Sequence, residues 1–266
     1  MSDQVLKRPE VLAPAGELEK LKIAIMYGAD AVYIGANAYS LRNRAGNFTY
    51  KEMEEGVNFA HLHQAKIYVA ANMVMHVGDE VGAGEFFCKL RDIGVCAVII
   101  SDPGLIEICL NKAPGLSIHL STQASAVNAE TLEFWKNEGL ERVVLARELS
   151  IKEIKEIRKK TSIEIEVFVH GAMCIAYSGR CVLSNHMSLR DANRGGCSQS
   201  CRWKYDLHDM KNAPEKFSIS STDLSMIEHI PDLIGAGVDS LKIEGRMKSI
   251  HYISTVTNVY KKAVDT

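Results

Sequence analysis

The chain of 266 residues lacks the features that mark membrane, secreted and disordered proteins. No stretch reaches about 18 uncharged apolar residues, so we expect no transmembrane helix and no membrane partner. The opening residues, MSDQVLKRPEVLAPAG, lack the apolar centre of a signal peptide. A net charge of only −2 with 47% hydrophobic residues excludes a disordered chain. We therefore expect a cytoplasmic globular protein with a large core.

Several catalytic and binding motifs are also missing. The sequence has no HExxH, GxSxG or P-loop motif, so it carries no recognisable peptidase or nucleotide-binding signature. General nucleic-acid-binding domains usually have a strong basic excess, which this chain does not have. Seven cysteines in a chain without an export signal favour metal binding, catalysis or burial over a disulfide framework.

A recurring pattern predicts eight strands. In this pattern a helical segment ends at a glycine, which readily adopts the left-handed conformation, and a short apolar run follows. Such runs are typical of strands buried on both faces. The full pattern occurs at residues 27–36, 93–104, 138–148 and 236–246. Four further apolar runs lie at residues 11–16, 66–73, 117–123 and 163–171.

Helical patterns separate these strands. They cover residues 17–27, 51–63, 82–93, 104–111, 128–137, 151–160 and 250–264. Ser150 and Glu153 have the spacing of a capping box, and Thr222 or Asp223 is expected to open a further helix that ends near Gly237. Strict alternation predicts an α/β fold, a TIM-like (β/α)8 barrel of parallel strands. A doubly wound open sheet is the alternative, although no GxGxxG follows the first strand.

Residues 171–217 break this rhythm as a long cysteine-rich insertion after the seventh strand. They contain Cys174, Cys181, Cys197 and Cys201 in the spacing C-x6-C-x15-C-x3-C. In a barrel this segment would lie at the carboxyl-terminal face, where active sites form. Four thiolates suit an iron–sulfur cluster or a structural zinc ion, and unliganded thiols are the third alternative. The remaining cysteines fall in helix and strand patterns and are predicted to be core residues; they are Cys88, Cys96 and Cys109.

Polar residues follow the predicted strand ends, and four of them are our catalytic candidates: Arg147, His170, Glu244 and Arg246. Arginine suits bidentate recognition of a carboxylate or phosphate. Other arginines of this face and further strand-end candidates are Arg42, Arg44, Arg180, Arg194, Pro14, Gly16, Asn37, Asn72, Asp102, Gln123 and Glu148. In the alternative interpretation, the arginines pair with Glu148 and Glu244 or lie at the surface, and His170 is a hydrogen-bonded structural histidine.

Residues 166–184 carry a family resemblance. They read EVFVHGAMCIAYSGRCVLS and match the peptidase family U32 signature, Glu-x-Phe-x-x-Gly-Ala/Ser-x-Cys-x4-Gly-x-Cys-x-x-Ser, at every fixed position. Other segments that resemble the family are LAPAG, GADAVYIG, LSTQ (120–123), RGGC (194–197) and LKIEGRMKS (241–249). On these motifs the chain is identified as a member of family U32.

The resemblance implies an oxygen-independent hydroxylase that carries a [4Fe–4S] cluster, although early family members were described as collagenase-like proteases. One branch makes 5-hydroxyuridine at the wobble position of tRNA, with prephenate implicated as hydroxyl source. Other branches act on a ribosomal RNA cytidine or, as a heterodimer, on a quinone precursor. The implied partners are tRNA, a small carboxylate donor and a homo- or hetero-oligomer. The implied cluster ligands are Cys174, Cys181, Cys197 and Cys201, and some branches take the fourth ligand from elsewhere.

Family members usually continue into a smaller β-rich domain, so we expect residues 1–266 to form the barrel domain alone. Two other interpretations stay open. A peptidase would need a nucleophile–base pair or an open zinc site on the barrel face. A non-catalytic barrel would carry a structural zinc ion and support a partner subunit.

Overall fold

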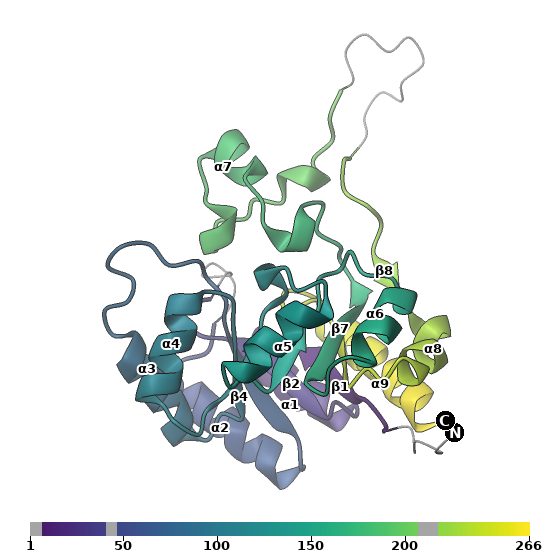
Figure 1. Cartoon of the computed structure of the whole chain (residues 1–266), viewed down its shortest axis with the longest axis horizontal. Helices are drawn as coiled ribbons and strands as arrows, with labels where there is room; N and C mark the ends of the chain where they lie inside the picture. Colours follow the sequence, from purple (N-terminus) through teal and green to yellow (C-terminus); the bar gives the residue numbers. More distant parts are fainter. Residues whose placement is uncertain (1–6, 41–46, 207–217) are drawn as a thin grey trace.

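Figure 1 shows the computed structural model, which describes residues 7–40, 47–206 and 218–266. The candidates Arg42 and Arg44 and the end of the predicted insertion, residues 207–217, lie outside this part of the chain. The described strands are β1 (Glu10–Pro14), β2 (Ala31–Gly35), β3 (Lys66–Ala71), β4 (Ala97–Ile100), β5 (Ser117–Leu120), β6 (Arg142–Val144), β7 (Glu164–Gly171), β8 (Leu224–Ser225) and β9 (Ser240–Ile243). Within the described ranges, no helix is long and apolar enough to cross a membrane.

The parallel strands close into a barrel. Each of β1 to β6 pairs with its neighbour in sequence, β9 lies between β1 and β7, and β6 pairs with β7. The last pairing aligns Arg142 with Glu164 and Val144 with Glu166, and it joins the two ends of the sheet. The predicted TIM-like barrel is therefore confirmed. The open-sheet alternative is wrong, because an open sheet would leave β6 and β7 unpaired with each other.

Helices surround the strands, as Figure 1 shows. They are α1 (Leu18–Met26), α2 (Tyr50–Leu62), α3 (Ala83–Ile93), α4 (Pro103–Lys112), α5 (Ala129–Asn137), α6 (Ile151–Arg158), α8 (Ile230–Gly235) and α9 (Ile250–Asp265), while α7 (Leu183–Ser188) belongs to the segment that follows β7. The capping box predicted at Ser150 is present, and a second one, at Thr49 and Glu52, was not predicted. The four glycines of the recurring pattern all have positive φ, as expected; they are Gly28, Gly94, Gly139 and Gly237.

The helix expected to open at Thr222 or Asp223 is wrong. Leu224 and Ser225 instead form β8, which pairs antiparallel with His170 and Gly171 at the end of β7. The α-helix starts only at Ile230, with Pro231 in its first turn. Proline has no backbone N–H and its ring clashes with the preceding turn, so a helix running from residue 222 through position 231 would be broken there.

Side chains alternate between two cores along each strand. Val11 and Ala13 of β1 face the larger core between strands and helices, whereas Leu12 lies in a small cluster inside the barrel with Tyr33 and Tyr68. This period of two is the ordinary strand alternation. The inner cluster is small because much of the barrel interior is occupied by charged side chains.

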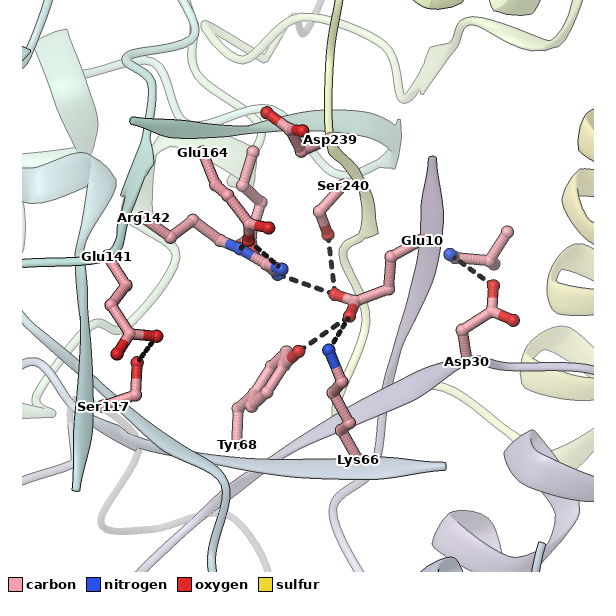
Figure 2. Close-up of polar contacts among 12 residues, drawn as sticks. Glu10, Asp30, Lys66, Tyr68, Ser117, Glu141, Arg142, Glu164, Asp239 and Ser240 are labelled. Carbon is pink, nitrogen blue, oxygen red and sulfur yellow. Dashed lines mark hydrogen bonds and ion pairs between the residues drawn. The ribbon is translucent and has the colours of Figure 1, made fainter. Parts of the chain in front are cut away.

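The buried charged side chains form one network at the amino-terminal end of the barrel, part of which Figure 2 shows around Glu10. Arg142 Nη1 donates to Glu10 Oε1 at 2.7 Å and to Glu166 Oε2 at 3.2 Å. The Glu10 carboxylate also accepts hydrogen bonds from the hydroxyls of Tyr68 and Ser240. Lys242 Nζ donates to Glu166 Oε1 at 2.6 Å, and the side chain of Glu166 is fully buried. The buried charges of Arg142, Glu166 and Lys242 therefore satisfy one another, and Glu164 and Lys66 extend the network to the surface.

We predict that Glu166→Gln destabilises the fold by about 3–5 kcal/mol, because removing one partner of a buried ion pair leaves the other charge uncompensated. Equilibrium denaturation monitored by circular dichroism measures the free energy of unfolding. The control is Glu156→Gln, which breaks an exposed pair with Lys159 of the same length, 2.6 Å, and should change that free energy little. Equal effects of the two substitutions would contradict this assignment.

Candidate functional site

A cavity of about 210 Å³ lies between the carboxyl ends of the strands and the segment of residues 172–206, which we call the cysteine segment. Figure 1 shows this segment, with α7, beyond the strand ends. Barrel residues that line the cavity include Asn72, Gln123, Arg147, Phe168, Lys242, Glu244 and Arg246, and the cysteine segment contributes Cys174, Cys181, Cys197 and Cys201. The structure thus brings three of the four catalytic candidates together with all four predicted ligands.

Specific hydrogen bonds hold the cysteine segment over the barrel. The Ser178 N–H donates to Glu148 Oε1 at 2.7 Å, so Glu148 anchors the segment instead of pairing with an arginine. Arg180 Nε donates to the Gln123 carbonyl at 2.7 Å. Arg194 forms an ion pair with Asp79 and donates to the Val74 carbonyl. These contacts fix the segment to loops that follow β3, β5 and β6.

The four cysteines of the segment are free thiols that lie near one another. Burial raises the pKa of the Cys201 thiol, and the neighbouring Cys174, Cys197 and Cys181 raise it further. In the described ranges, no three His, Cys, Asp or Glu side chains form a group that is placed to hold a metal ion. The four thiols share one cavity and influence one another.

Backbone amides point at two of these sulfurs. The Leu183 N–H donates to Cys181 Sγ at 3.3 Å. Burial raises the pKa of the Cys174 thiol, whereas a hydrogen bond from the Ala176 backbone and the charge of Arg147 lower it. Hydrogen bonds to sulfur and a nearby cation favour the thiolate, which is the form that binds metal.

A serine network, which we did not predict, positions the cysteines. Ser184 Oγ accepts from the Ser198 N–H at 3.1 Å, and Ser198 Oγ also contacts Ser188 Oγ and Ser200 Oγ. These serines lie close in sequence to Cys181, Cys197 and Cys201. Asn193 also positions Cys181. Its Oδ1 accepts a hydrogen bond from the Cys181 N–H, and its Nδ2 donates one to the Cys181 carbonyl. The signal in the sequence was the serine next to Cys197 and to Cys201, at positions 198 and 200.

Arg147, Glu244 and Arg246 lie at the barrel side of the cavity. The Arg147 guanidinium stacks over the Phe168 ring, 4.1 Å from its centroid, and lies 3.9 Å from Glu244. Arg246 is buried and its Nη2 donates to Ser40 Oγ at 3.2 Å. Gly35 makes room for it, since a Cβ there would stand 1.9 Å from Arg246 Nη1.

His170 is not among the residues that line the cavity. Its Nδ1 lies 3.3 Å from the Tyr260 hydroxyl, its ring packs on Tyr252 and Tyr260, and burial lowers its pKa. The register between β7 and β9 shifts between Phe168 and His170, and such irregularities redirect the side chains that follow. These contacts fit the structural alternative, and a catalytic role for His170 stays a prediction.

Lys242 is a cavity residue that we missed. It reaches from the barrel network to the cavity, with its ammonium 4.7 Å from the centroid of the Tyr33 ring and 5.3 Å from that of Phe168. A lysine inside an otherwise apolar strand, LKI, was the available signal, because a lysine is almost never fully buried unless it is paired.

A sequence profile of peptidase family U32 matches residues 16–266. The chain belongs to peptidase family U32. The tRNA hydroxylation protein P1 of Bacillus subtilis is 55% identical over 98% of this chain and 64% of its own length. The 23S rRNA 5-hydroxycytidine synthase of Escherichia coli is 39% identical over 97% of this chain and 39% of its own length. The chain thus spans less than two thirds of either relative.

A solved structure of a U32 peptidase has the same fold. Its TM-score is 0.59 over 89% of this chain and 93% of that one, at 16% sequence identity. The U32 signature can now be placed on the structure. The signature glutamate, Glu166, forms an ion pair with Lys242. The signature phenylalanine, Phe168, packs under the guanidinium of Arg147. The last serine of the signature, Ser184, belongs to the serine network. Gly171 has φ +102°, and a Cβ there would lie 2.7 Å from the Glu244 carbonyl oxygen.

The cysteines of the cysteine segment also differ from the remaining ones in surroundings. Cys109 is fully buried as predicted, and Cys88 and Cys96 are half-buried against the core. Burial raises the pKa of the Cys109 thiol to about 12. Cys197, by contrast, is exposed.

We therefore predict that iodoacetamide labels Cys197 of the metal-free native protein and spares Cys109. At about pH 8 only about one Cys109 thiol in ten thousand would be ionised at that pKa, and the thiolate is the reactive form. Peptide mass spectrometry after timed labelling measures both rates, and labelling in denaturant is the control that both peptides are detected. Similar rates in the native protein would contradict the placement of Cys109.

Proposed function

We propose that this chain is the barrel of an iron–sulfur-dependent RNA hydroxylase that acts on tRNA. The observation that carries the proposal is that the four cysteines of the cysteine segment line the same cavity as Arg147, Glu244 and Arg246, at the barrel face where active sites form. Relatives named for tRNA hydroxylation and for synthesis of 5-hydroxycytidine in 23S rRNA support RNA as the substrate class. The wobble uridine is the proposed target.

The donor set suits a [4Fe–4S] cluster. Four thiols share the cavity, and the Leu183 and Ala176 amides are directed at two of the sulfurs, as is usual where thiolates hold such clusters. A cluster spreads its four thiolates over four irons, so its ligands need not converge on one point. Cys174, Cys181, Cys197 and Cys201 would hold it, and the bound cluster would supply one-electron chemistry.

The cationic side of the cavity suits a small carboxylate, for which prephenate is the proposed hydroxyl donor. Arg147 is held flat against Phe168, and it presents its guanidinium to the cavity with only a distant contact to Glu244 at 3.9 Å. A planar guanidinium binds a carboxylate through two parallel hydrogen bonds. Arg246 and Lys242 line the same cavity and add positive charge. The role of the chain here is to bind and orient the donor.

The cysteine segment also carries the charge and the rings that RNA requires. Residues 172–206 contain four arginines and one lysine against two aspartates, a net charge of +3, so the rest of this chain of charge −2 carries −5. Arg190, Lys204, Tyr177 and Trp203 are exposed on this segment. Basic side chains contact phosphates and exposed aromatic rings stack on bases, so this face suits single-stranded RNA.

The first prediction from this proposal concerns iron. Protein purified without oxygen should contain about four irons and four sulfides per chain, and Cys174→Ala or Cys181→Ala should lose most of both. Iron and sulfide analysis with a visible spectrum measures the content. The control is Cys88→Ala, whose thiol lies outside the cavity and donates to the Lys112 carbonyl, and which should keep its iron. Stoichiometric zinc, or no metal under anaerobic handling, would overturn the cluster.

The second prediction concerns RNA binding. Arg190→Glu and Lys204→Glu should each weaken binding of unmodified tRNA several-fold and should flatten the salt dependence of log Kd by about one unit per lost phosphate contact. Fluorescence anisotropy over a salt series measures both quantities. Lys152→Glu makes the same charge change at an exposed position of α6 and serves as control. If all three variants weaken binding equally, RNA does not dock on the cysteine segment.

A further inference from the structure

The LSTQ motif, residues 120–123, ends at the cavity with Gln123. It leads from β5 into the short 3-10 helix Thr122–Ala124. Thr122 Oγ1 donates to the Leu145 carbonyl at 3.0 Å, which ties the turn to the loop that follows β6. The Gln123 carbonyl accepts from Arg180 Nε of the cysteine segment. The backbone around Gln123 is thus held from two sides.

The backbone of Gln123 is held by a hydrogen bond, but its side-chain oxygen is not. Gln123 is 5% exposed and lines the cavity, and its buried Oε1 has no hydrogen-bond partner among the described residues. Buried polar atoms are almost always paired, so an unpaired one that faces a cavity points to a ligand. A purely structural role would favour an apolar side chain at this position.

A second unpaired group lines the same cavity. Arg147 Nε is buried and also has no hydrogen-bond partner among the described residues. Of these two atoms on cavity-lining residues, Gln123 Oε1 is an acceptor and Arg147 Nε is a donor. A carboxylate could satisfy the arginine alone, because it carries acceptors and no donor. Gln123 Oε1 then needs a donor from another ligand, and a pyrimidine base presents one on its pairing edge.

We propose that Gln123 binds the pairing edge of the pyrimidine that is to be hydroxylated. The inference rests on the proposed function and names the group that reads the target base. Because the amide lies inside the cavity, the base must leave the RNA stack to reach it, as bases do in other enzymes that modify them. Gln123 then holds the base through its amide while the C5 edge on the opposite side of the ring stays free.

The test compares two variants of the iron-loaded enzyme. Gln123→Leu keeps similar bulk but removes the amide, and it should lower kcat/KM for hydroxylation of a tRNA anticodon stem-loop at least tenfold. Its Kd for the RNA should change less than threefold, because phosphate contacts dominate affinity. Gln123→Glu keeps the acceptor and should retain more activity than Gln123→Leu. The control is Asn111→Leu, which removes an exposed amide at the end of α4, outside the cavity lining.

Thermal unfolding of the same proteins supplies a readout that is independent of activity. Gln123→Leu should unfold at the same or a higher temperature, because an unpaired buried polar atom is replaced by an apolar group. A clear loss of stability would show that the amide is structural and would overturn the inference. Wild-type activity retained by Gln123→Leu would overturn it as well. A wild-type enzyme that loads iron but does not modify RNA would overturn the proposed function itself.

Discussion

The buried carboxylate of Glu166 is the constraint on which the barrel and its cavity depend. Barrels of this fold usually fill their interior with branched apolar side chains. Here Glu166 is fully buried on β7 and must be compensated by Arg142 from β6 and Lys242 from β9. An ion pair removed from water is stabilising only when each charge is matched and hydrogen-bonded. The network therefore acts only when β6, β7 and β9 are in register, at the position where the barrel closes.

The same network orients the cavity above it. Lys242 pairs with Glu166 and passes beside the rings of Tyr33 and Phe168 on its way to the cavity. Phe168 in turn supports the guanidinium of Arg147. The Glu166–Lys242 ion pair thus lies beside Phe168, and Phe168 in turn supports Arg147 at the cavity. This succession explains why a glutamate two positions before Phe168 belongs to the same signature as the cysteines, although it touches none of them.

The parts that could be predicted from the sequence are those with local causes. Strand positions follow from apolar runs after a glycine, and Gly28, Gly94, Gly139 and Gly237 all have the expected backbone. The grouping of Cys174, Cys181, Cys197 and Cys201 followed from their spacing and their place after a strand. The failed helix prediction has a non-local cause. Strand β8 exists because it pairs with the overhanging end of β7, which the helix prediction at residues 222–223 could not include. Such a pairing is not visible in a local window of sequence.

Unpaired polar atoms at the carboxyl-terminal end of the barrel support the assignment of the cavity. Both ends hold buried polar groups, but at the amino-terminal end Glu10, Arg142 and Glu166 find partners within the chain. At the carboxyl-terminal end Gln123 Oε1 and Arg147 Nε do not, among the residues that the structure describes. An unpaired polar atom destabilises the fold wherever it lies, and these two atoms belong to residues that line the cavity, so ligand binding in the cavity accounts for them. These unpaired atoms lower the stability of the fold at the place where the cysteines, the arginine and the amide meet. We expect the chemistry of the chain at the same place.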